Sequence, residues 1–595
     1  MVAYIPMEGY LMKKELTGYP SIDKPQNNGY SFSARHPVIP NMSVYNSIQL
    51  INTFYKKKDA IDCIDLNASY EQLINDSVII SKALKELGVK KGEIVSVCMP
   101  NYYQAVATFL ACNRIGAVVT FLNANASKDE ICDYLNTFES SVFINFDKTD
   151  LENEEIKNNS CVRYIITLDK SKVNNLLMDK DYHITHNDSF IDFSSLESIS
   201  KYQKKGLPNN NSKDNCLILF TSGTTGKPKS VVLTNENVLA AGTYLKNSSH
   251  VKSLNGDKTL VCVPFSYPYG FVTSTIMTLL SSKTAILAPD ISKDTISYYL
   301  KKNPNIIFGS PALLELIMRN IEDSQDLSSI TTFISGGDFL TPNHSKRGKE
   351  FLESHGARNV EMGNGSGNAE TVSCGTNPTG IEIRPETAGK VLVGTDAIIV
   401  DPETMEEKKY NEVGLLCVSG KHVFKEYFKN QKATSEVKFE RGGKIFFKTG
   451  TLGSIDEDGY FTLTGRESRF YIMSSLNKVY CDRIQNLISY MDNVSDCAVV
   501  KVPDEEMLYK NKAYIVLKDG VEPSMEVMDS IKEQFLKPVL TANNTKEQLK
   551  SYEIPSYIEF ISELPRKAGT DKIDYSFLEQ DALEKLEAKQ KVLKI

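Results

Sequence analysis

The segment from Thr221 to Ser230, TSGTTGKPKS, contains the residues best suited to phosphate chemistry. Three threonines and two serines supply hydroxyl groups, two lysines supply positive charge, and two glycines let the backbone come close to a ligand. Such a loop can wrap the oxygens of a polyphosphate, although its composition alone would also suit a flexible surface turn. Gly223 and Gly226 are too close together for a Walker A loop, and Pro228 stands where that motif has Ser or Thr. The spacing therefore argues against a P-loop phosphotransferase.

The overall composition is that of an ordinary globular protein. The 595 residues carry 68 Lys and Arg against 75 Asp and Glu, a net charge of -7, and 41% of them are hydrophobic. This balance excludes collagen-like and disordered chains, and the mild acidity gives no general attraction to nucleic acid. No apolar run approaches the ~18 residues that a membrane span needs, and the N-terminus lacks a signal-peptide pattern. We therefore expect a cytoplasmic protein with no membrane span and no nucleic-acid partner.

The 11 cysteines support the same compartment. They are odd in number, form no CxxC pair and mostly lie in apolar runs such as CLILF. This pattern is typical of buried free thiols in a reducing environment rather than of disulfides or a zinc site.

Helical and strand patterns alternate along the first part of the chain. Leu73, Ile80 and Leu84 recur at helical spacing, and a short apolar strand follows at 94–98. A helix around 103–115 and a strand at 117–122 repeat the pattern. Helices that alternate with short apolar strands predict an α/β fold of mostly parallel sheets covered by helices on both faces.

Changes in composition divide the chain into three regions. Residues 1–43 are rich in Pro, Asn, Ser and Tyr and are predicted to form an irregular N-terminal arm. Residues 44–465 form the large domain, within which the polar stretch 204–215 is predicted to be a surface loop. A small C-terminal domain, 466–595, follows and ends in a charged helix from about residue 576.

The string from Thr221 to Lys229 resembles the phosphate loop of the AMP-forming adenylating superfamily, which includes acyl- and aryl-CoA synthetases, adenylation domains of nonribosomal peptide synthetases and firefly luciferase. The likeness continues in order through segments 69–101, 115–131, 448–466 and 554–574. It implies a large α/β domain and a small, mobile α+β C-terminal domain. It also implies an ATP-dependent ligase that activates a carboxylic acid as acyl-AMP, releases pyrophosphate and passes the acyl group to a thiol.

The resemblance assigns roles to individual residues. Thr225, Glu370 and Lys572 are the catalytic candidates: Glu370 would hold Mg²⁺ against the phosphates of ATP, and Lys572 would bridge the substrate carboxylate and the α-phosphate. A compact ammonium group suits this task because it can neutralise two anions as they approach each other. The residues expected to bind ATP are Thr221, Ser222, Gly223, Thr224, Thr225, Gly226, Lys229, Gly336, Gly337, Gly367, Thr451 and Arg466.

Four positions depart from the pattern of that superfamily. Thr451 stands where the superfamily has an Asp that accepts hydrogen bonds from both ribose hydroxyls, and losing such charged hydrogen bonds costs on the order of 1.5 to 3 kcal/mol. Ser366 replaces an aromatic residue that stacks on adenine, and Ala369 replaces a hydroxyl near the metal. Ser468 replaces an acidic residue at the hinge. The alternative hypothesis is therefore a catalytically impaired homologue that binds a ligand or a partner protein.

The segment 264–289 bears on the choice of substrate because it contains no Asp or Glu. A relative that activates an amino acid needs an acid in this region to pair with the substrate ammonium, so we expect a fatty, aryl or other simple carboxylic acid. The predicted pocket residues are Tyr267, Tyr269, Gly270, Gly309 and Pro311. For the two tyrosines, an ordinary place in the core is an equal alternative. The predicted acceptor is coenzyme A, with an acyl carrier protein as the alternative.

Overall fold

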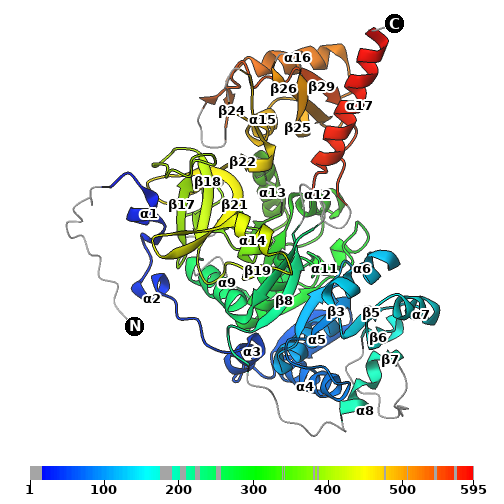
Figure 1. The fold of residues 1–595 in the computed structure, drawn as a ribbon. Coiled ribbons are helices and arrows are strands. Elements are labelled where there is room, and N and C mark those ends of the chain that lie inside the picture. The colour runs from blue at the N-terminus through cyan, green and yellow to red at the C-terminus, as the bar shows by residue number, and fades with distance from the viewer. Residues whose placement is uncertain are drawn as a thin grey trace.

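The computed structural model describes residues 16–174, 190–200, 210–221, 228–249, 256–337, 340, 342–378, 382–384, 387–474, 478–504, 507–541, 546–567 and 572–593. Two large sheets, built mainly from parallel strands, form most of the lower part of the molecule (Figure 1). In the 7-stranded sheet, with the order β14-β13-β12-β10-β11-β1-β2, the pair β1–β2 is antiparallel and the other pairs are parallel. In the 8-stranded sheet, with the order β19-β9-β8-β4-β3-β5-β6-β7, strand β9 runs antiparallel to both its neighbours.

The strands of these two sheets are short and buried. Those of the first sheet are β1 (Asp59–Cys63), β2 (Leu66–Ser69), β10 (Lys258–Val261), β11 (Thr284–Leu287), β12 (Ile306–Gly309), β13 (Thr332–Ser335) and β14 (Glu361–Asn364). Those of the second are β3 (Ile94–Cys98), β4 (Val118–Phe121), β5 (Val142–Phe146), β6 (Tyr164–Leu168), β7 (Phe190–Asp192), β8 (Asn215–Phe220), β9 (Ser230–Thr234) and β19 (Glu426–Tyr427).

Helices cover the faces of both sheets. They are α3 (Val44–Ile51), α4 (Tyr70–Glu86), α5 (Tyr103–Ile115), α6 (Lys128–Phe138), α7 (Asp150–Asn158), α8 (Leu196–Ser200), α9 (Asn235–Ser248), α10 (Met277–Leu280), α11 (Ile296–Leu300), α12 (Pro311–Asn320) and α13 (Pro342–Ser354). Local sequence starts several of them: Ser69 and Gln72 form a capping box at α4, as Ser127 and Glu130 do at α6. The predicted alternation of helices and parallel strands is confirmed.

A third sheet of five antiparallel strands lies beside the parallel sheets (Figure 1). It consists of β17 (Asp396–Val400), β18 (Gly414–Ser419), β20 (Lys438–Arg441), β21 (Lys444–Ile455) and β22 (Phe461–Arg466), and α14 (Gln431–Val437) precedes β20. Strand β22 leads directly into the last part of the chain. This sheet therefore joins the parallel core to the C-terminal unit.

The C-terminal unit has its own small sheet and its own core. Its strands are β25 (Val494–Asp504), β26 (Leu508–Leu517) and β29 (Tyr557–Phe560), and its helices are α15 (Cys481–Ile488), α16 (Met525–Phe535) and α17 (Tyr575–Leu593). Figure 1 shows this unit above β22, with α17 along its outer side. An α+β unit follows a large α/β part, as the resemblance implies. None of the described helices is both long and apolar enough to cross a membrane.

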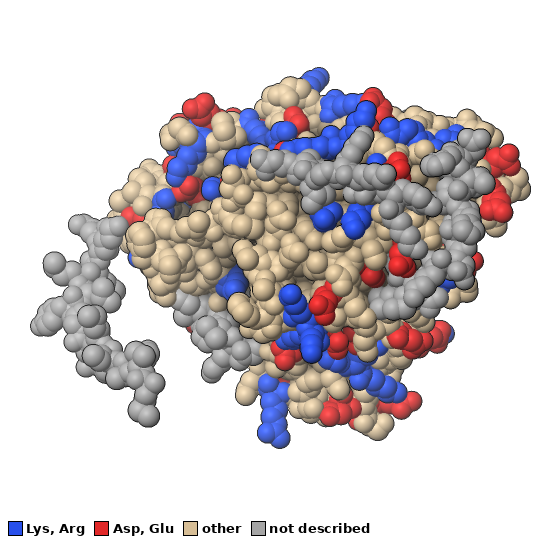
Figure 2. Space-filling model, turned by 90° about the horizontal axis from the view of Figure 1, so that it is seen from below, with Lys and Arg blue, Asp and Glu red and all other residues tan. Residues whose placement is uncertain are grey.

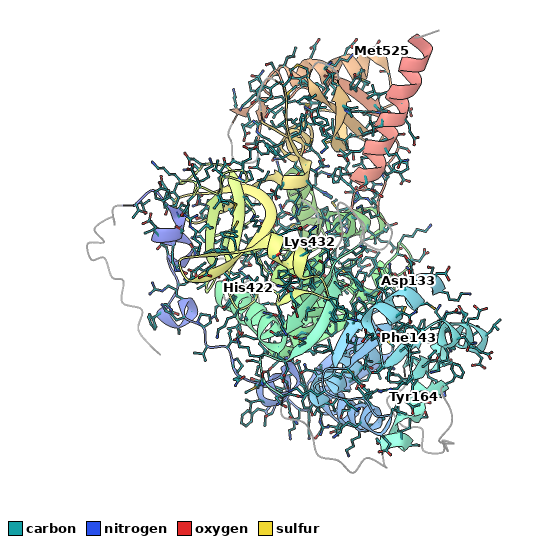
Figure 3. All side chains as sticks on the ribbon, in the orientation of Figure 1. Asp133, Phe143, Tyr164, His422, Lys432 and Met525 are labelled. Atoms are coloured by element: carbon teal, nitrogen blue, oxygen red, sulfur yellow. The ribbon has the colours of Figure 1, made fainter. Side chains whose placement is uncertain are left out.

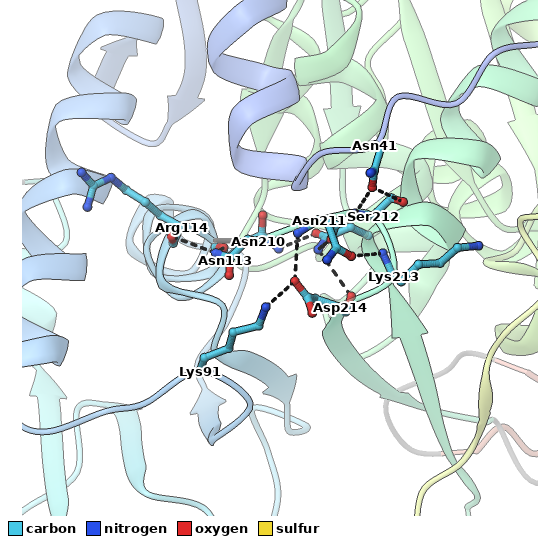
Figure 4. Close-up of polar contacts among 10 residues, drawn as sticks. Asn41, Lys91, Asn113, Arg114, Asn210, Asn211, Ser212, Lys213 and Asp214 are labelled. Carbon is cyan, nitrogen blue, oxygen red and sulfur yellow. Dashed lines mark hydrogen bonds and ion pairs between the residues drawn. The ribbon is translucent and has the colours of Figure 1, made fainter. Parts of the chain in front are cut away.

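The described part of the N-terminal arm is fastened to the large domain. It contains the short helices α1 (Pro20–Asp23) and α2 (Phe32–Arg35), and Lys24 Nζ lies 2.6 Å from an Asp396 carboxylate oxygen. Near its end, Asn41 accepts hydrogen bonds from the backbone N–H (3.1 Å) and the hydroxyl (2.9 Å) of Ser212 (Figure 4). The described part of the arm thus contains short helices and lies against the large domain.

The end of the predicted surface loop before β8 is partly buried and held by side-chain contacts. Ser212 is only 5% exposed because it packs under the arm. Lys91 pairs with Asp214 at 2.7 Å, and the Asn210 side chain donates to the Arg114 carbonyl at 3.0 Å (Figure 4). The end of the predicted surface loop is therefore anchored on both sides, which fixes where β8 begins.

A buried histidine, His422, is labelled in the large domain in Figure 3. It is 0% exposed, it packs edge-on against Tyr244 with ring centroids 5.4 Å apart, and neither of its ring nitrogens has a hydrogen-bond partner among the described residues. Burial lowers its pKa from 6.5 to about 4. The fold therefore holds His422 in its neutral form.

We predict that His422 makes the protein less stable in acid. The unfolded chain takes up a proton near pH 6.5 and the folded protein only near pH 4, so this stability is fully present above pH 6.5 and is lost as the pH falls to 4. The loss is about 3 kcal/mol by linkage. Urea unfolding of wild type and His422→Leu across this pH range measures it, and the variant should lose less stability. Equal pH dependence in both proteins would contradict the prediction.

Candidate active site

A cavity of about 820 Å³ opens where several chain segments converge. Gly309, Gly336 and Gly365 line it at the ends of β12, β13 and β14, which are neighbours in the parallel sheet. The carboxyl ends of parallel strands are the usual position for a ligand site in such sheets. Arg466 and Lys572, from much later in the chain, line the same cavity.

Close packing explains the glycines at this edge. A Cβ on Gly336 would lie 2.8 Å from the Tyr269 ring, and one on Gly367 would lie 2.5 Å from the Ser373 backbone. Gly337 has a φ of 87°, a conformation that favours glycine. Gly336, Gly337 and Gly367, all predicted to bind ATP, line the cavity with backbone rather than side chains.

Lys572 lines the cavity and belongs to the C-terminal unit. Arg566 and Ile573 pair across an antiparallel bridge, and the Lys567 N–H donates to the Lys572 carbonyl at 2.8 Å. The Lys572 side chain lies over Gly337, with its Cε 3.7 Å from the position that a Cβ would occupy there. The structure thus brings the predicted lysine to the ends of the parallel strands.

The two ends of the predicted phosphate loop are held together. The Thr221 N–H donates to the Lys229 carbonyl at 2.9 Å, and the Lys229 N–H donates to the Thr221 hydroxyl at 3.0 Å. Thr221 lines the cavity, whereas Lys229 does not. The predicted residues between them, Ser222, Gly223, Thr224, Thr225 and Gly226, lie outside the described residues. The loop therefore begins at the cavity.

Glu370 is the one predicted carboxylate in the cavity wall, and it is 7% exposed. Burial raises its pKa, while a hydrogen bond from Tyr427 and the charges of Lys229 and Arg466 act in the opposite direction. The Tyr427 hydroxyl donates to Glu370 Oε1 at 2.5 Å. The Lys229 Nζ lies 5.0 Å from the centre of the Tyr427 ring. Tyr427 therefore contacts both a predicted metal ligand and a predicted phosphate ligand.

Arg466 and Thr451 form a second pair at the cavity. The Arg466 Nη1 donates to the Thr451 hydroxyl at 2.8 Å, and the Arg466 N–H donates to Asp482 at 2.8 Å. Thr451 is 2% exposed and is not among the cavity-lining residues, whereas Arg466 is. Thr451 therefore contacts a cavity-lining side chain, that of Arg466. Beside this pair, Asn368 lines the cavity and donates from its side chain to the Thr449 carbonyl at 2.8 Å.

The predicted acyl-pocket residues divide into two groups. Tyr267, Tyr269 and Gly309 line the cavity, but Gly270 and Pro311 do not. Tyr269 begins a π-helical segment, Tyr269–Ile276, and its hydroxyl donates to the Ile334 carbonyl at 2.7 Å. Its hydroxyl is thus engaged with the protein backbone while its ring forms part of the wall. Burial raises the pKa of Tyr267 to about 12.

Few charged side chains line this cavity. Among the described residues that do so, the charged ones are Asp290, Glu370, Arg466 and Lys572. Asp290 follows directly after the acid-free segment 264–289, and its side chain is exposed. Much of the remaining wall is apolar, including Phe220, Leu245, Phe308 and Leu313. The cavity thus combines a cationic and acidic region with an apolar one.

Three cavity-related residues were not identified from the sequence. Tyr427 acts on Glu370 from 57 positions away along the chain. Asn368 lies between Ser366 and Glu370, where the resemblance gives it no role, and Asp290 lies one position beyond the acid-free segment 264–289. An amide side chain directly after Gly365 and Gly367 is the sequence feature that could have pointed to Asn368.

A chain of this kind, with parallel sheets, a cavity at their carboxyl ends and a basic residue supplied by a C-terminal α+β unit, has the architecture of an adenylate-forming enzyme. The chain belongs to the AMP-binding enzyme family: that family's model matches residues 52–428, and the model of the AMP-binding enzyme C-terminal domain matches residues 483–570. The resemblance drawn from the sequence is therefore confirmed.

Similar proteins agree with this assignment. A long-chain-fatty-acid–CoA ligase of Bacillus subtilis is 26% identical over 557 residues, which cover 91% of this chain and 95% of the relative. A protein of the same organism named as an acyl-CoA synthetase is 26% identical over 535 residues, covering 87% and 92%. The crystal structure of an anthranilate CoA ligase with anthranoyl-AMP has the same fold, with a TM-score of 0.77, 20% identity, and coverage of 93% and 99%. The protein is an AMP-forming acid–thiol ligase of the acyl-CoA synthetase type.

We predict that Tyr427→Phe shifts the pH dependence of adenylation. The lost hydrogen bond stabilised the ionised form of Glu370, so the pKa of Glu370 should rise further. Any step that needs the carboxylate is then lost at a higher pH, and the acid limb of the ATP–pyrophosphate exchange profile should move upward. Tyr410→Phe is the matched control, because Tyr410 also donates to a carboxylate, that of Asp23 at 3.1 Å, but this carboxylate, unlike that of Glu370, does not line the cavity. An unshifted acid limb in Tyr427→Phe would refute the role.

Proposed function

We propose that the protein activates a monocarboxylic acid with an uncharged tail as its adenylate and transfers the acyl group to coenzyme A. One observation carries this proposal: Thr221, at the start of the phosphate loop, Glu370 and Lys572 all line one cavity. These residues come from distant parts of the chain, and each has a distinct task in phosphate chemistry.

The first half-reaction joins two anions, the substrate carboxylate and the α-phosphate of ATP. Lys572 would lie between them, since its ammonium can neutralise both as they approach. Arg466 would add charge near the ribose and phosphates, and the loop from Thr221 to Lys229 would hold the outer phosphates. Catalysis then depends on placing charges where anionic oxygens crowd together.

Mg²⁺ fits the acidic side of the site. Proteins bind this ion through one or two carboxylates together with substrate phosphates, and Glu370 is a buried carboxylate facing the cavity. The ion would neutralise phosphate charge when bound. Tyr427 would hold the Glu370 carboxylate in place by its hydrogen bond.

The cavity wall supports a substrate with an uncharged tail. Arg466 and Lys572 are its basic residues among those described, and both are assigned to the nucleotide and the reacting carboxylate. A second anionic group on the substrate would therefore lack a partner. Asp290 could attract an ammonium, but its side chain is exposed, where water screens its charge. Apolar acids, aliphatic or aromatic, fit this wall best.

Coenzyme A is the proposed acceptor because the relatives named above are CoA ligases or synthetases. An acyl carrier protein is the alternative thiol. We also propose a cytoplasmic location, where ten of the eleven cysteines, which are at least partly buried, would stay reduced.

The proposal is tested by measuring pyrophosphate release with ATP, Mg²⁺ and a panel of aliphatic and aromatic monocarboxylic acids, followed by thioester formation on adding coenzyme A. Release that depends on one class of acid supports the proposal. An impaired homologue, the alternative suggested by Thr451, Ser366, Ala369 and Ser468, would give no release across the panel but could still bind a ligand in calorimetry.

We predict that Lys572→Ala loses the first half-reaction selectively. Removing a charge that acts on the transition state lowers a rate on the order of a hundredfold or more. ATP–pyrophosphate exchange should fall by this amount, whereas thioester formation from a supplied acyl-adenylate should persist. Loss of both activities would point to misfolding or to a different role, and Lys572→Arg tests whether charge alone suffices.

We predict that Thr451→Asp tightens ATP binding. A carboxylate at this position would meet the Arg466 guanidinium that now donates to the Thr451 hydroxyl, and it could accept charged hydrogen bonds from the ribose. The KM for ATP should fall by roughly tenfold, the effect of 1.5 kcal/mol or slightly less. Thr451→Asn, similar in shape but uncharged, should show little of this gain. An unchanged or higher KM in Thr451→Asp would count against a ribose contact here.

A further inference from the structure

A short segment of the large domain displays apolar side chains to solvent next to a run of lysines. It comprises the end of α3 and the two turns after it, residues 50–58, with the sequence LINTFYKKK. Leu50, Ile51, Phe54 and Tyr55 are 63%, 43%, 93% and 50% exposed. Contiguous apolar side chains on a surface usually mark an interaction site.

Hydrogen bonds fix this segment in its outward-facing form. Asn52 is buried, and its side-chain amide donates to the Ile48 carbonyl at 2.8 Å and to the Leu279 carbonyl at 3.0 Å. The Tyr55 N–H donates to the Asn52 carbonyl at 2.9 Å, and the Glu71 N–H donates to the Lys56 carbonyl at 2.9 Å. The exposed rings are therefore held away from the core by an ordered turn, with Phe54 near its tip.

The charges of the segment have one sign. It contains three lysines and no acid. Lys58 Nζ pairs with Asp257 at 2.7 Å, whereas Lys56 and Lys57 are exposed and form no ion pair with any described residue. Figure 2 looks onto the lower face of the molecule, where both basic and acidic side chains border an area without charged side chains. The exposed Asp59 follows the segment directly and Glu71 contacts Lys56 through its backbone, but neither carboxylate forms an ion pair with Lys56 or Lys57 among the described residues. The segment thus combines apolar side chains with two lysines outside these ion pairs.

We propose that the 50–58 segment docks the protein on an anionic phospholipid surface. Aromatic and aliphatic side chains of this kind enter the boundary between headgroups and acyl chains, while adjacent lysines stay at the level of the phosphates. Anionic lipid supplies the charge that complements Lys56 and Lys57. A second copy of the chain suits the segment less well, since a twofold contact would bring the lysines of both copies together.

Vesicle sedimentation with the full chain tests this proposal. Wild type should bind phosphatidylglycerol–phosphatidylcholine vesicles more tightly than pure phosphatidylcholine vesicles. Phe54→Ser should weaken binding to both kinds of vesicle about tenfold, because the variant lacks the aromatic ring whose transfer from water into the membrane favours binding. Each lysine near an anionic surface contributes about fivefold, so Lys56→Gln with Lys57→Gln should weaken binding to anionic vesicles about 25-fold and hardly change binding to neutral ones.

Matched controls come from exposed residues elsewhere in the chain. Met525→Ser and Lys432→Gln alter an exposed apolar and an exposed basic residue away from α3 (Figure 3) and should leave vesicle binding unchanged. ATP–pyrophosphate exchange should be the same in all these variants and wild type, which separates this proposal from the proposed ligase activity. Failure of wild type to bind anionic vesicles, or equal losses in the controls, would overturn the proposal. So would a dimer in solution that Phe54→Ser dissociates.

Discussion

Electrostatic repulsion is the constraint on which the arrangement of this protein depends. A carboxylate that attacks ATP brings several anionic oxygens into a small volume, and cations must be present there before the bond forms. The parallel sheets supply backbone at the cavity through Gly309, Gly336 and Gly365. The basic side chains of the described cavity wall, Arg466 and Lys572, come instead from the end of β22 and from the C-terminal unit. A site divided in this way is complete only when the C-terminal unit lies over the strand ends.

On the acidic side of the cavity, the buried carboxylate of Glu370 must be kept ionised. A buried carboxylate tends to become neutral, because burial raises its pKa. Three neighbours of Glu370 favour its ionised form: Tyr427 by a hydrogen bond, and Lys229 and Arg466 by their charges. Tyr427 is central to this group, since its hydroxyl contacts Glu370 while its ring lies beneath the Lys229 ammonium. One aromatic side chain thereby couples the residue expected to bind metal to the end of the phosphate loop.

The sequence predicted the parts of this protein that local patterns determine. Periodic Leu and Ile residues correctly predicted α4, and short apolar runs correctly predicted β3 and β4. Such patterns lie within one short stretch of sequence, so they can be recognised without knowing which distant residues they pack against. The order of motifs revealed the family and the α+β unit. Contacts between distant segments could not be predicted in this way. Tyr427 donates a hydrogen bond to Glu370, and Ser212 donates one to Asn41, and both contacts depend on tertiary packing rather than on a spacing in the sequence.

The threonine at position 451 affects the electrostatics around Arg466, which donates to its hydroxyl. A carboxylate there would neutralise much of the guanidinium charge, whereas a threonine hydroxyl accepts one hydrogen bond and leaves that charge in place. Arg466 already acts on Glu370, whose ionised form it favours. With a threonine at this position, a larger positive charge therefore remains at the cavity wall.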